Sequence, residues 1–284
     1  MRIIDTHAHF WDFDILQYPW IEKGSVFDRT YSLADYLHAS AQAPSSAVIF
    51  VEADAHPSCT LREALWAADL AARDRRIQGI VARVMLTENP HVVAELDAVA
   101  AIPLVRGIRD NIQNHPPGFS LQSSFISGVK CVARHGLHFE LCLKHWQLGE
   151  ALELVKRCPE VRFVLNHCAK PDIRSGGREP WRSQINSMAA LPNVVCKISG
   201  LLTEADWETW RLEEVLWYAR QAVDAFGPAR VMYGSDWPVN ETAGGFMEWY
   251  RVAEALTASW SSDDKEGFFH RNAEGVYRLS PAAT

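Results

Sequence analysis

The sequence predicts a (β/α)8 barrel, which is a closed parallel sheet surrounded by helices. Eight short runs of apolar and β-branched residues occur along the chain, each with the length of a fully buried strand. Segments with helical periodicity separate most of these runs, and such alternation is typical of a parallel sheet. The chain has 284 residues, close to the roughly 250 that are usual for this barrel. We therefore expect a single domain over residues 1–284.

The predicted strands are rich in Val, Ile, Leu and Phe, which suit the interior of a sheet. Between them, the segments 61–70 and 148–155 combine helix-forming residues with a helical spacing of apolar ones, so both are expected to be helices. The eight strands are expected, in order, at 2–8 (RIIDTHA), 47–53 (AVIFVEA), 79–85 (GIVARVM), 104–109 (LVRGIR), 138–143 (HFELCL), 161–166 (VRFVLN), 193–198 (NVVCKI) and 230–235 (RVMYGS).

Three connections are longer than a simple turn. The first, 10–33, is rich in aromatic residues; the second, 171–181, contains a Gly-Gly pair; the third is 237–245. Each of them follows a predicted strand, which in a barrel places it on the face where active sites lie. Long loops in compact domains are usually functional, so we expect these connections to border the site.

Composition and charge favour a small molecule as the ligand. The formal net charge is −7, without a basic run, which argues against nucleic acid or an anionic membrane as a partner. No apolar stretch reaches the 18 or more residues of a membrane span, and the first strand leaves no room for a signal peptide, so we expect a cytoplasmic protein. The six cysteines form no CxxC pair and are expected to be reduced and buried. A homo-oligomer is allowed but not required by these features.

Two histidines close the first predicted strand. His7 and His9 are two residues apart, so their imidazoles point to the same face of the strand, roughly 6.6 Å apart along it. His167 follows the sixth strand and Asp236 follows the eighth, where Gly234 allows close approach of another backbone or of a ligand. The ends of parallel strands converge at one rim of a barrel. We therefore expect these four residues to share one site.

Nearly every predicted strand ends in a polar residue, and such groups are not buried in a packed barrel without partners. Convergence on one polar pocket is the economical explanation. For Glu52, Arg83 and Lys197, an equally good alternative is that they form structural ion pairs inside the barrel. The polar residues at strand ends are His7, His9, Glu52, Asp54, Arg83, Arg109, Asp110, Glu140, Asn166, His167, Lys197, Ser199 and Asp236.

Four segments give the chain a resemblance to a known family. They are IIDTHAHFWD at the start, VLNHCAKP, GSDWPV, and HRNAEGVYRL near the end. The chain resembles the amidohydrolase superfamily, and within it the amidohydrolase-2 branch that contains sugar lactonases of the L-fuconolactonase type and 2-pyrone-4,6-dicarboxylate lactonase. The resemblance implies a distorted (β/α)8 barrel with His7, His9, His167 and Asp236 at its mouth.

The chain departs from the metal-dependent pattern of this superfamily. Members that hold zinc generally add a histidine from strand 5 and, in binuclear enzymes, a lysine from strand 4. Here strand 4 ends in Arg109, and strand 5 offers Glu140 or His138, unless His145 in the next loop reaches back. His7, His9 and Asp236 could still supply the three protein ligands of one divalent metal such as zinc. We prefer the interpretation in which no metal is required for turnover.

The resemblance implies hydrolysis of a sugar-acid lactone. Asp236 is the expected base that activates water, while His7, His9, His167 and Arg109 are expected to polarise the carbonyl group. A neutral lactone fits better than a dicarboxylate, because few arginines lie near strand ends. The residues expected to contact the substrate are Trp11, Glu52, Arg83, Glu140, His145, Asn166 and Trp237, with Trp20 and Trp146 as further aromatic candidates.

Two alternatives remain open at the level of sequence. The first is a zinc-dependent decarboxylase of the aminocarboxymuconate semialdehyde decarboxylase type, which shares the fold and the strand 1 histidine pair. The second is a catalytically silent barrel that binds a sugar acid or acts as a scaffold, because fold alone does not give function.

Overall fold

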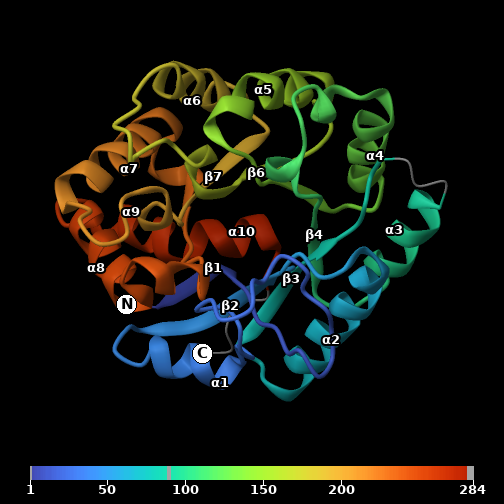
Figure 1. Ribbon diagram of the computed structural model, residues 1–284. Helices are drawn as coiled ribbons and strands as arrows, with labels where there is room; N and C mark the ends of the chain where they lie inside the picture. The colour runs from blue at the N-terminus through green and yellow to red at the C-terminus, as the bar shows by residue number, and fades with distance from the viewer. Residues whose placement is uncertain (1, 88–90, 280–284) are drawn as a thin grey trace.

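A computed structural model describes residues 2–87 and 91–279 of the chain. Its centre is an eight-stranded parallel sheet in the order β1 to β8, and Figure 1 shows the helices arranged in a ring around it. This confirms the predicted (β/α)8 barrel. The strands are β1 (Ile3–Ala8), β2 (Ser45–Val51), β3 (Ile77–Arg83), β4 (Val105–Arg109), β5 (His138–Leu141), β6 (Phe163–Leu165), β7 (Val194–Ile198) and β8 (Val231–Tyr233).

The barrel closes between β8 and β1 just beyond the end of β8. The backbone N–H of Asp236 donates to the carbonyl of His7 at 2.8 Å, and that of His9 donates to the carbonyl of Trp237 at 2.7 Å. These two bonds continue the parallel pairing through His7, His9 and Asp236, three of the residues predicted to share one site. The closure of the sheet therefore holds the two ends of the candidate site in register.

The helices cover the outside of the barrel, and the two segments predicted to be helical lie within α2 and α5. Among the described residues, no helix has the length and apolar character needed to cross a lipid bilayer. The α-helices are α1 (Leu33–Ala39), α2 (Thr60–Arg73), α3 (Val92–Ala100), α4 (Ser123–Arg134), α5 (Leu148–Arg157), α6 (Trp181–Ala189), α7 (Leu212–Phe226), α8 (Gly245–Thr257), α9 (Ser262–Glu266) and α10 (Asn272–Tyr277).

The connection 10–33 is held together by aromatic packing. The ring of Trp11 lies 4.9 Å from that of Tyr31 and 5.6 Å from that of Trp20, measured between ring centroids. Its indole N–H donates to the carbonyl of Arg29 at 2.7 Å. Edge-to-face contacts of this kind stabilise a loop without regular secondary structure. The connection therefore forms a fixed wall beside the barrel mouth.

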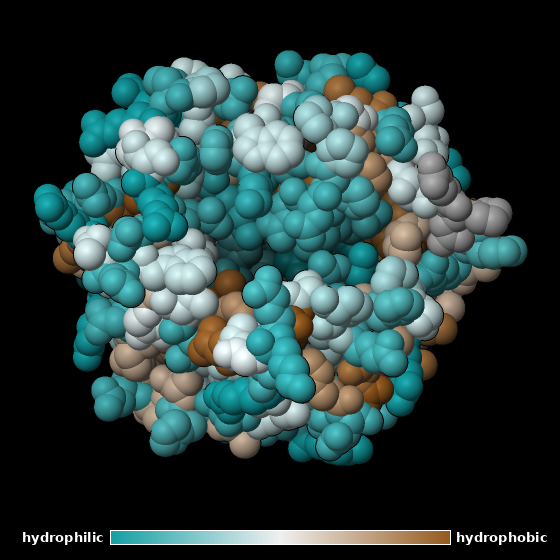
Figure 2. Space-filling model, viewed as in Figure 1, coloured by the Kyte–Doolittle hydropathy of each residue, from teal (hydrophilic) through white to brown (hydrophobic). Residues whose placement is uncertain are grey.

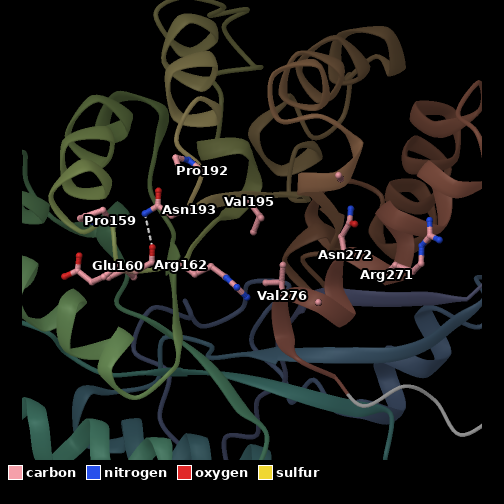
Figure 3. A pocket seen from close by; sticks show the side chains of 12 residues that line it. Pro159, Glu160, Arg162, Pro192, Asn193, Val195, Arg271, Asn272 and Val276 are labelled. Carbon is pink, nitrogen blue, oxygen red and sulfur yellow. Dashed lines mark hydrogen bonds between the residues drawn. The ribbon is translucent and has the colours of Figure 1, made fainter.

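Helix α10 covers the opposite end of the barrel. The hydroxyl of Tyr277 donates to Glu140 inside the barrel at 2.8 Å, and Glu140 also accepts from Lys197 at 2.8 and 2.6 Å. Beside α10, a cavity of about 640 Å³ lies between the N-terminal ends of β6 and β7 (Figure 3). Its polar residue Asn193 donates to the carbonyl of Val161 at 2.9 Å, a bond that ties two chain segments together. This end of the barrel carries structural contacts, as expected for the N-terminal face.

Candidate active site

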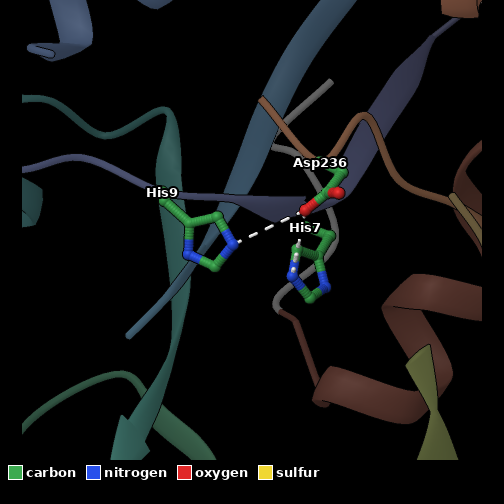
Figure 4. Close-up of side chains that lie close together, drawn as sticks. All are labelled: His7, His9 and Asp236. Atoms are coloured by element: carbon green, nitrogen blue, oxygen red, sulfur yellow. Dashed lines mark ion pairs between the residues drawn. The ribbon is translucent and has the colours of Figure 1, made fainter. Parts of the chain in front are cut away.

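Three imidazoles surround one carboxylate oxygen at the mouth of the barrel. Oδ1 of Asp236 lies 3.7 Å from Nε2 of His7, 3.6 Å from Nε2 of His9 and 3.7 Å from Nε2 of His167 (Figure 4 shows the first two). All four side chains are almost fully buried. The four residues that the sequence analysis placed in one site do come together. Since all three separations exceed a direct hydrogen bond, these atoms can share a small species such as a water molecule or a cation.

Asp5 holds two backbone segments of the site together through hydrogen bonds. Its Oδ1 accepts hydrogen bonds from the backbone N–H of Ser235 at 2.8 Å and of His7 at 3.1 Å. A single buried carboxylate thus joins the end of β1 to the segment after β8. Asp236 itself has φ +61°, a conformation that costs energy for a side chain of this kind. Its neighbours in the closed sheet hold it there.

His167 belongs to a left-handed turn. Four successive residues have positive φ: His167 (+53°), Cys168 (+51°), Ala169 (+61°) and Lys170 (+46°). Each such residue costs roughly 1–2 kcal/mol for an L-amino acid, so the turn is strained. Hydrogen bonds hold it, from Lys170 N–H to the carbonyl of His167 and from the indole of Trp181 to the carbonyl of Cys168, both at 2.8 Å. Backbone strain of this kind clusters at functional sites.

The second nitrogen of each imidazole has its own partner. Nδ1 of His9 lies 2.9 Å from the carbonyl of Val51, and because a carbonyl only accepts, Nδ1 carries a proton. Both nitrogens of His7 face cations that only donate, since Nδ1 lies 3.2 Å from the Lys197 ammonium and Nε2 lies 3.5 Å from Nη1 of Arg109. His167 uses Nδ1 to contact the hydroxyl of Ser199 at 2.8 Å. Each of the three rings is thus held in its orientation by a contact at Nδ1.

Burial sets the protonation of these groups. It lowers the pKa of His7 well below its usual value, with further lowering by Lys197, and it lowers the pKa of His167 to about 3. Burial alone would raise the pKa of Asp236, but the adjacent His167, His9 and Lys170 outweigh it and bring the pKa below its usual value. At neutral pH, Asp236 is therefore a carboxylate beside neutral His7 and His167.

Arg109 reaches the site from the end of β4. Its Nη2 donates to the carbonyl of Glu52 at 2.6 Å, its Nε donates to the Glu52 carboxylate, and its Nη1 lies 3.5 Å from Nε2 of His7. Burial acts to lower the pKa of Arg109, but the Glu52 carboxylate outweighs it and raises this pKa. Glu52 therefore holds a permanent cation in place. This is the structural ion pair that the sequence analysis gave as the alternative for Glu52.

A cavity of about 260 Å³ opens above these residues. Figure 2 shows a hollow with mainly hydrophilic walls in the middle of the face that is viewed in Figure 1. The sequence analysis did not predict the wall beyond β4, which is formed by Asn111, Gln113 and Asn114. Their position directly after Arg109 could have indicated it. It is held by the carbonyl of Cys142, which accepts from the N–H groups of Ile112 and Gln113, both at 3.1 Å. The residues that line the cavity are His9, Trp20, Ala53, Asp54, Arg109, Asn111, Gln113, Asn114, Cys142, His167, Lys170, Asp236 and Val239.

Several predicted substrate contacts lie elsewhere. Trp11 and Trp237 are buried in the aromatic packing of the 10–33 wall, where Trp237 donates to Glu241 at 2.9 Å. Glu140 is buried in the barrel interior by Lys197 and Tyr277, because a carboxylate at that depth needs donors on all sides. These three positions are corrections to the sequence analysis.

The remaining predicted contacts do not line the cavity. Arg83 pairs with Asp54, a lining residue, at 2.6 Å. His145 lies 3.2 Å from the carbonyl of Lys170 through Nδ1 and is not part of the metal donor set. Asn166 is fully buried, and within the described residues its side-chain amide has no hydrogen-bond partner. Of the aromatic candidates, Trp20 lines the cavity, whereas Trp146 is half exposed and does not.

One donor set has the make-up of a metal site. A nitrogen from each of His7 and His9 and an oxygen from Asp236 lie within 4.8 Å of one another. Two imidazoles and one carboxylate are ligands that zinc accepts, and three protein ligands leave a position open for water or substrate. Because Nδ1 of His9 donates to the carbonyl of Val51, Nε2 is the nitrogen that would face the cation. By residue type and spacing, the set fits one divalent cation.

Comparison with known proteins decides the family. The family model described as Amidohydrolase matches residues 4–279. The chain belongs to the amidohydrolase family. This amidohydrolase is 32% identical to an L-fucono-1,5-lactonase from Burkholderia multivorans over 294 residues, which cover 99% of this chain and 97% of that protein.

Solved structures give the same grouping. This amidohydrolase superposes on an amidohydrolase from Burkholderia multivorans with bound zinc, with a TM-score of 0.89 and 32% identity over 99% of this chain and 100% of that one. A probable 2-pyrone-4,6-dicarboxylic acid hydrolase from Acinetobacter baumannii (TM-score 0.81, 13% identity, 98% and 100% covered) and a 5-carboxyvanillate decarboxylase from Sphingomonas paucimobilis (TM-score 0.68, 14% identity, 98% and 99% covered) share the fold.

Proposed function

We propose that this amidohydrolase hydrolyses a sugar-acid lactone, similar to L-fuconolactone, to the open-chain acid. The observation that carries this proposal is the arrangement of three imidazole nitrogens at 3.6–3.7 Å around Oδ1 of Asp236. It provides a buried carboxylate that can take a proton from water, next to donors for a developing negative charge. The L-fucono-1,5-lactonase relative, which aligns over almost the whole chain, supports the substrate class.

The chemistry assigns a task to each group. Asp236, a carboxylate at neutral pH, takes a proton from the water that attacks the lactone carbonyl. The oxygen of that carbonyl gains negative charge, which needs donors fixed in advance. Nη1 of Arg109 and Nε2 of His7 lie 3.5 Å apart, so the two groups stand side by side. We assign them to the carbonyl oxygen, with His9 and His167 orienting the water.

The cavity suits a neutral, hydroxylated ring. Its far wall carries the amides of Asn111, Gln113 and Asn114. These amides can donate hydrogen bonds to hydroxyl groups and accept hydrogen bonds from them. The amide oxygens of Asn111 and Gln113 have no partner among the described residues, and such buried groups usually receive one from a ligand or water. Trp20 adds an aromatic face at the rim, a common surface for a sugar ring.

A divalent metal, if bound, would be held by His7, His9 and Asp236, and it would supply Lewis acidity toward the carbonyl oxygen. We propose that turnover does not require it. Nη1 of Arg109, part of a permanent cation, lies 3.5 Å from Nε2 of His7, the nitrogen that a metal would need. That guanidinium can itself stabilise the oxyanion.

We expect protein dialysed against a chelator, with its metal content measured by mass spectrometry, to keep most of its lactonase kcat/KM. A loss of activity that added zinc restores would assign the metal a required role. In that case the assay should be extended to carbon dioxide release from aromatic carboxylates, because a required zinc is what the decarboxylase alternative predicts.

The proposed function is tested with a panel of substrates. We expect proton release on incubation with neutral aldonolactones, with lower kcat/KM for analogues that lack ring hydroxyl groups, because the amide wall then loses its partners. A dicarboxylate lactone is the matched negative substrate. Inactivity toward every aldonolactone, with intact folding, would reject the proposal.

Replacement of Arg109 by lysine tests the oxyanion assignment. We expect Arg109→Lys to lower kcat/KM about tenfold. This is less than the 10²–10³ lost when an oxyanion donor is removed outright, because lysine keeps the charge but not the planar fork that Glu52 binds. Arg106→Lys is the control, since Arg106 lies on the same strand outside the cavity. An unchanged kcat/KM in Arg109→Lys would remove Arg109 from the reaction.

A further inference from the structure

We propose that Lys170 is a catalytic residue that protonates the ring oxygen of the lactone as it leaves. The proposal rests on lactone hydrolysis being the reaction. It concerns the second half of that reaction, for which the residues named so far supply no acid. The chain provides Lys170 three residues after His167, in the left-handed turn described above.

The turn places Lys170 beside the reacting groups. In a tight turn with three residues per repeat, side chains three positions apart lie on the same side. His167 and Lys170 have this spacing, and both line the cavity together with Asp236. The strained backbone thus aims an imidazole and an ammonium group into one space.

The donors of Lys170 are free to bind a ligand. Its Nζ forms an ion pair with Glu204 at 3.8 Å, which is longer than a hydrogen bond, and no hydrogen bond from this Nζ occurs within residues 2–87 and 91–279. Lys197 is the contrast, since its ammonium donates to both oxygens of Glu140 and to His7. Lys197 is therefore saturated, whereas Lys170 has N–H groups for a substrate that enters the cavity.

The charge surroundings keep Lys170 as a proton donor. Burial acts to lower its pKa, but the neighbouring Cys142, Glu204 and Asp236 outweigh burial and raise the pKa above its usual value. An ammonium group is thus present at neutral pH. It is still far more acidic than the alcohol formed by ring opening, so transfer to an alkoxide is downhill.

The reaction involves three oxygens, and each of them is assigned to a residue at the end of a different strand. Asp236 follows β8 and faces the attacking water, Arg109 ends β4 and faces the carbonyl oxygen, and Lys170 follows β6 and faces the ring oxygen. These strands alternate along one half of the barrel, separated by β5 and β7. A tetrahedral carbon presents its oxygens in different directions, and groups from three separate strands match that requirement.

Ring opening consumes one water molecule and releases one proton. Water adds to the carbonyl carbon and its proton passes to Asp236. The bond between that carbon and the ring oxygen breaks, its electron pair goes to the ring oxygen, and that oxygen takes a proton from Lys170. The carboxylic acid formed loses a proton at neutral pH. The protons held by Asp236 and by the acid restore Lys170 and release one proton to solvent in each turnover.

The test compares leaving groups. The leaving group of an aldonolactone is an alkoxide. On this substrate we expect Lys170→Met to lower kcat by about a hundredfold or more, the usual scale for a lost general acid. The leaving group of dihydrocoumarin is a stable phenolate, which needs little protonation. On this substrate we expect kcat to fall by less than about tenfold. Lys156→Met removes an exposed lysine from α5 and is the matched control, expected to act as wild type on both substrates.

The outcomes separate this proposal from the proposed function. Equal losses on the two lactones, or a change in KM alone, would overturn the role of Lys170 while leaving lactone hydrolysis intact. If the wild type cleaves dihydrocoumarin but no aldonolactone, δ-valerolactone replaces the sugar as the alkoxide substrate and the comparison still decides. Activity on the aryl lactone also reports whether the variant is folded.

Discussion

Asp236→Asn should reduce turnover of an aldonolactone at least about a hundredfold, the scale for losing a positioned base. Asparagine has nearly the same shape, so it can occupy the same place among the three imidazoles. It cannot accept a proton from water, and its amide nitrogen cannot replace the anion that faces His9 and His167. The loss should appear in kcat, because the carboxylate acts on water rather than on the sugar.

The measurement is steady-state kinetics by proton release, with a thermal melt to show that the variant is folded. Asp224→Asn is the matched control, because Asp224 is exposed on α7 and does not line the cavity. Wild-type kcat in Asp236→Asn would show that water is activated by another group.

Gly200→Ala should also cost about a hundredfold in kcat/KM, the scale associated with a displacement of roughly 1 Å in an active site. Gly200 follows β7 with φ +61° and lies against two active-site side chains. A Cβ at this position would lie 2.6 Å from Nδ1 of His167 and 2.9 Å from Oδ2 of Asp236. Atoms that close cannot coexist, so His167 or Asp236 must move.

Gly176→Ala separates this steric effect from backbone strain. Gly176 has φ +69°, and a Cβ there would meet nothing within 4 Å. Both variants carry the cost of placing alanine at positive φ, about 1 kcal/mol, but only Gly200→Ala disturbs the imidazole and the carboxylate. Similar kinetics in the two variants would contradict the steric explanation.

The barrel itself was predictable because its strands are buried on both faces and read as continuous apolar runs. All eight runs contain or overlap the strands observed, with shifts of a few residues at their ends. The meeting of His7, His9, His167 and Asp236 was predictable for a related reason, since strand ends converge in a parallel barrel. The single-domain organisation and the roles assigned to these residues remain predictions.

The wall of the cavity was harder to predict, because side chains near a strand end can point to the cavity, the core or the helices. Glu140 has the same kind of position as Arg109, one strand away, yet it faces the barrel interior and pairs with Lys197. Trp11 and Trp237 support the wall from behind. Lys170 escaped notice because four consecutive left-handed residues without glycine have no recognisable pattern in sequence.

The contact between Tyr277 and Glu140 has a consequence for biosynthesis. Strand β1 touches Lys197 through His7, Lys197 neutralises Glu140, and Glu140 accepts a hydrogen bond from a helix translated after all eight strands. Until residue 277 has left the ribosome, the Glu140 carboxylate of a nascent chain therefore lacks one of its hydrogen-bond donors. Products of premature termination before α10 should therefore be cleaved by proteases faster than the full chain, because they lack this contact.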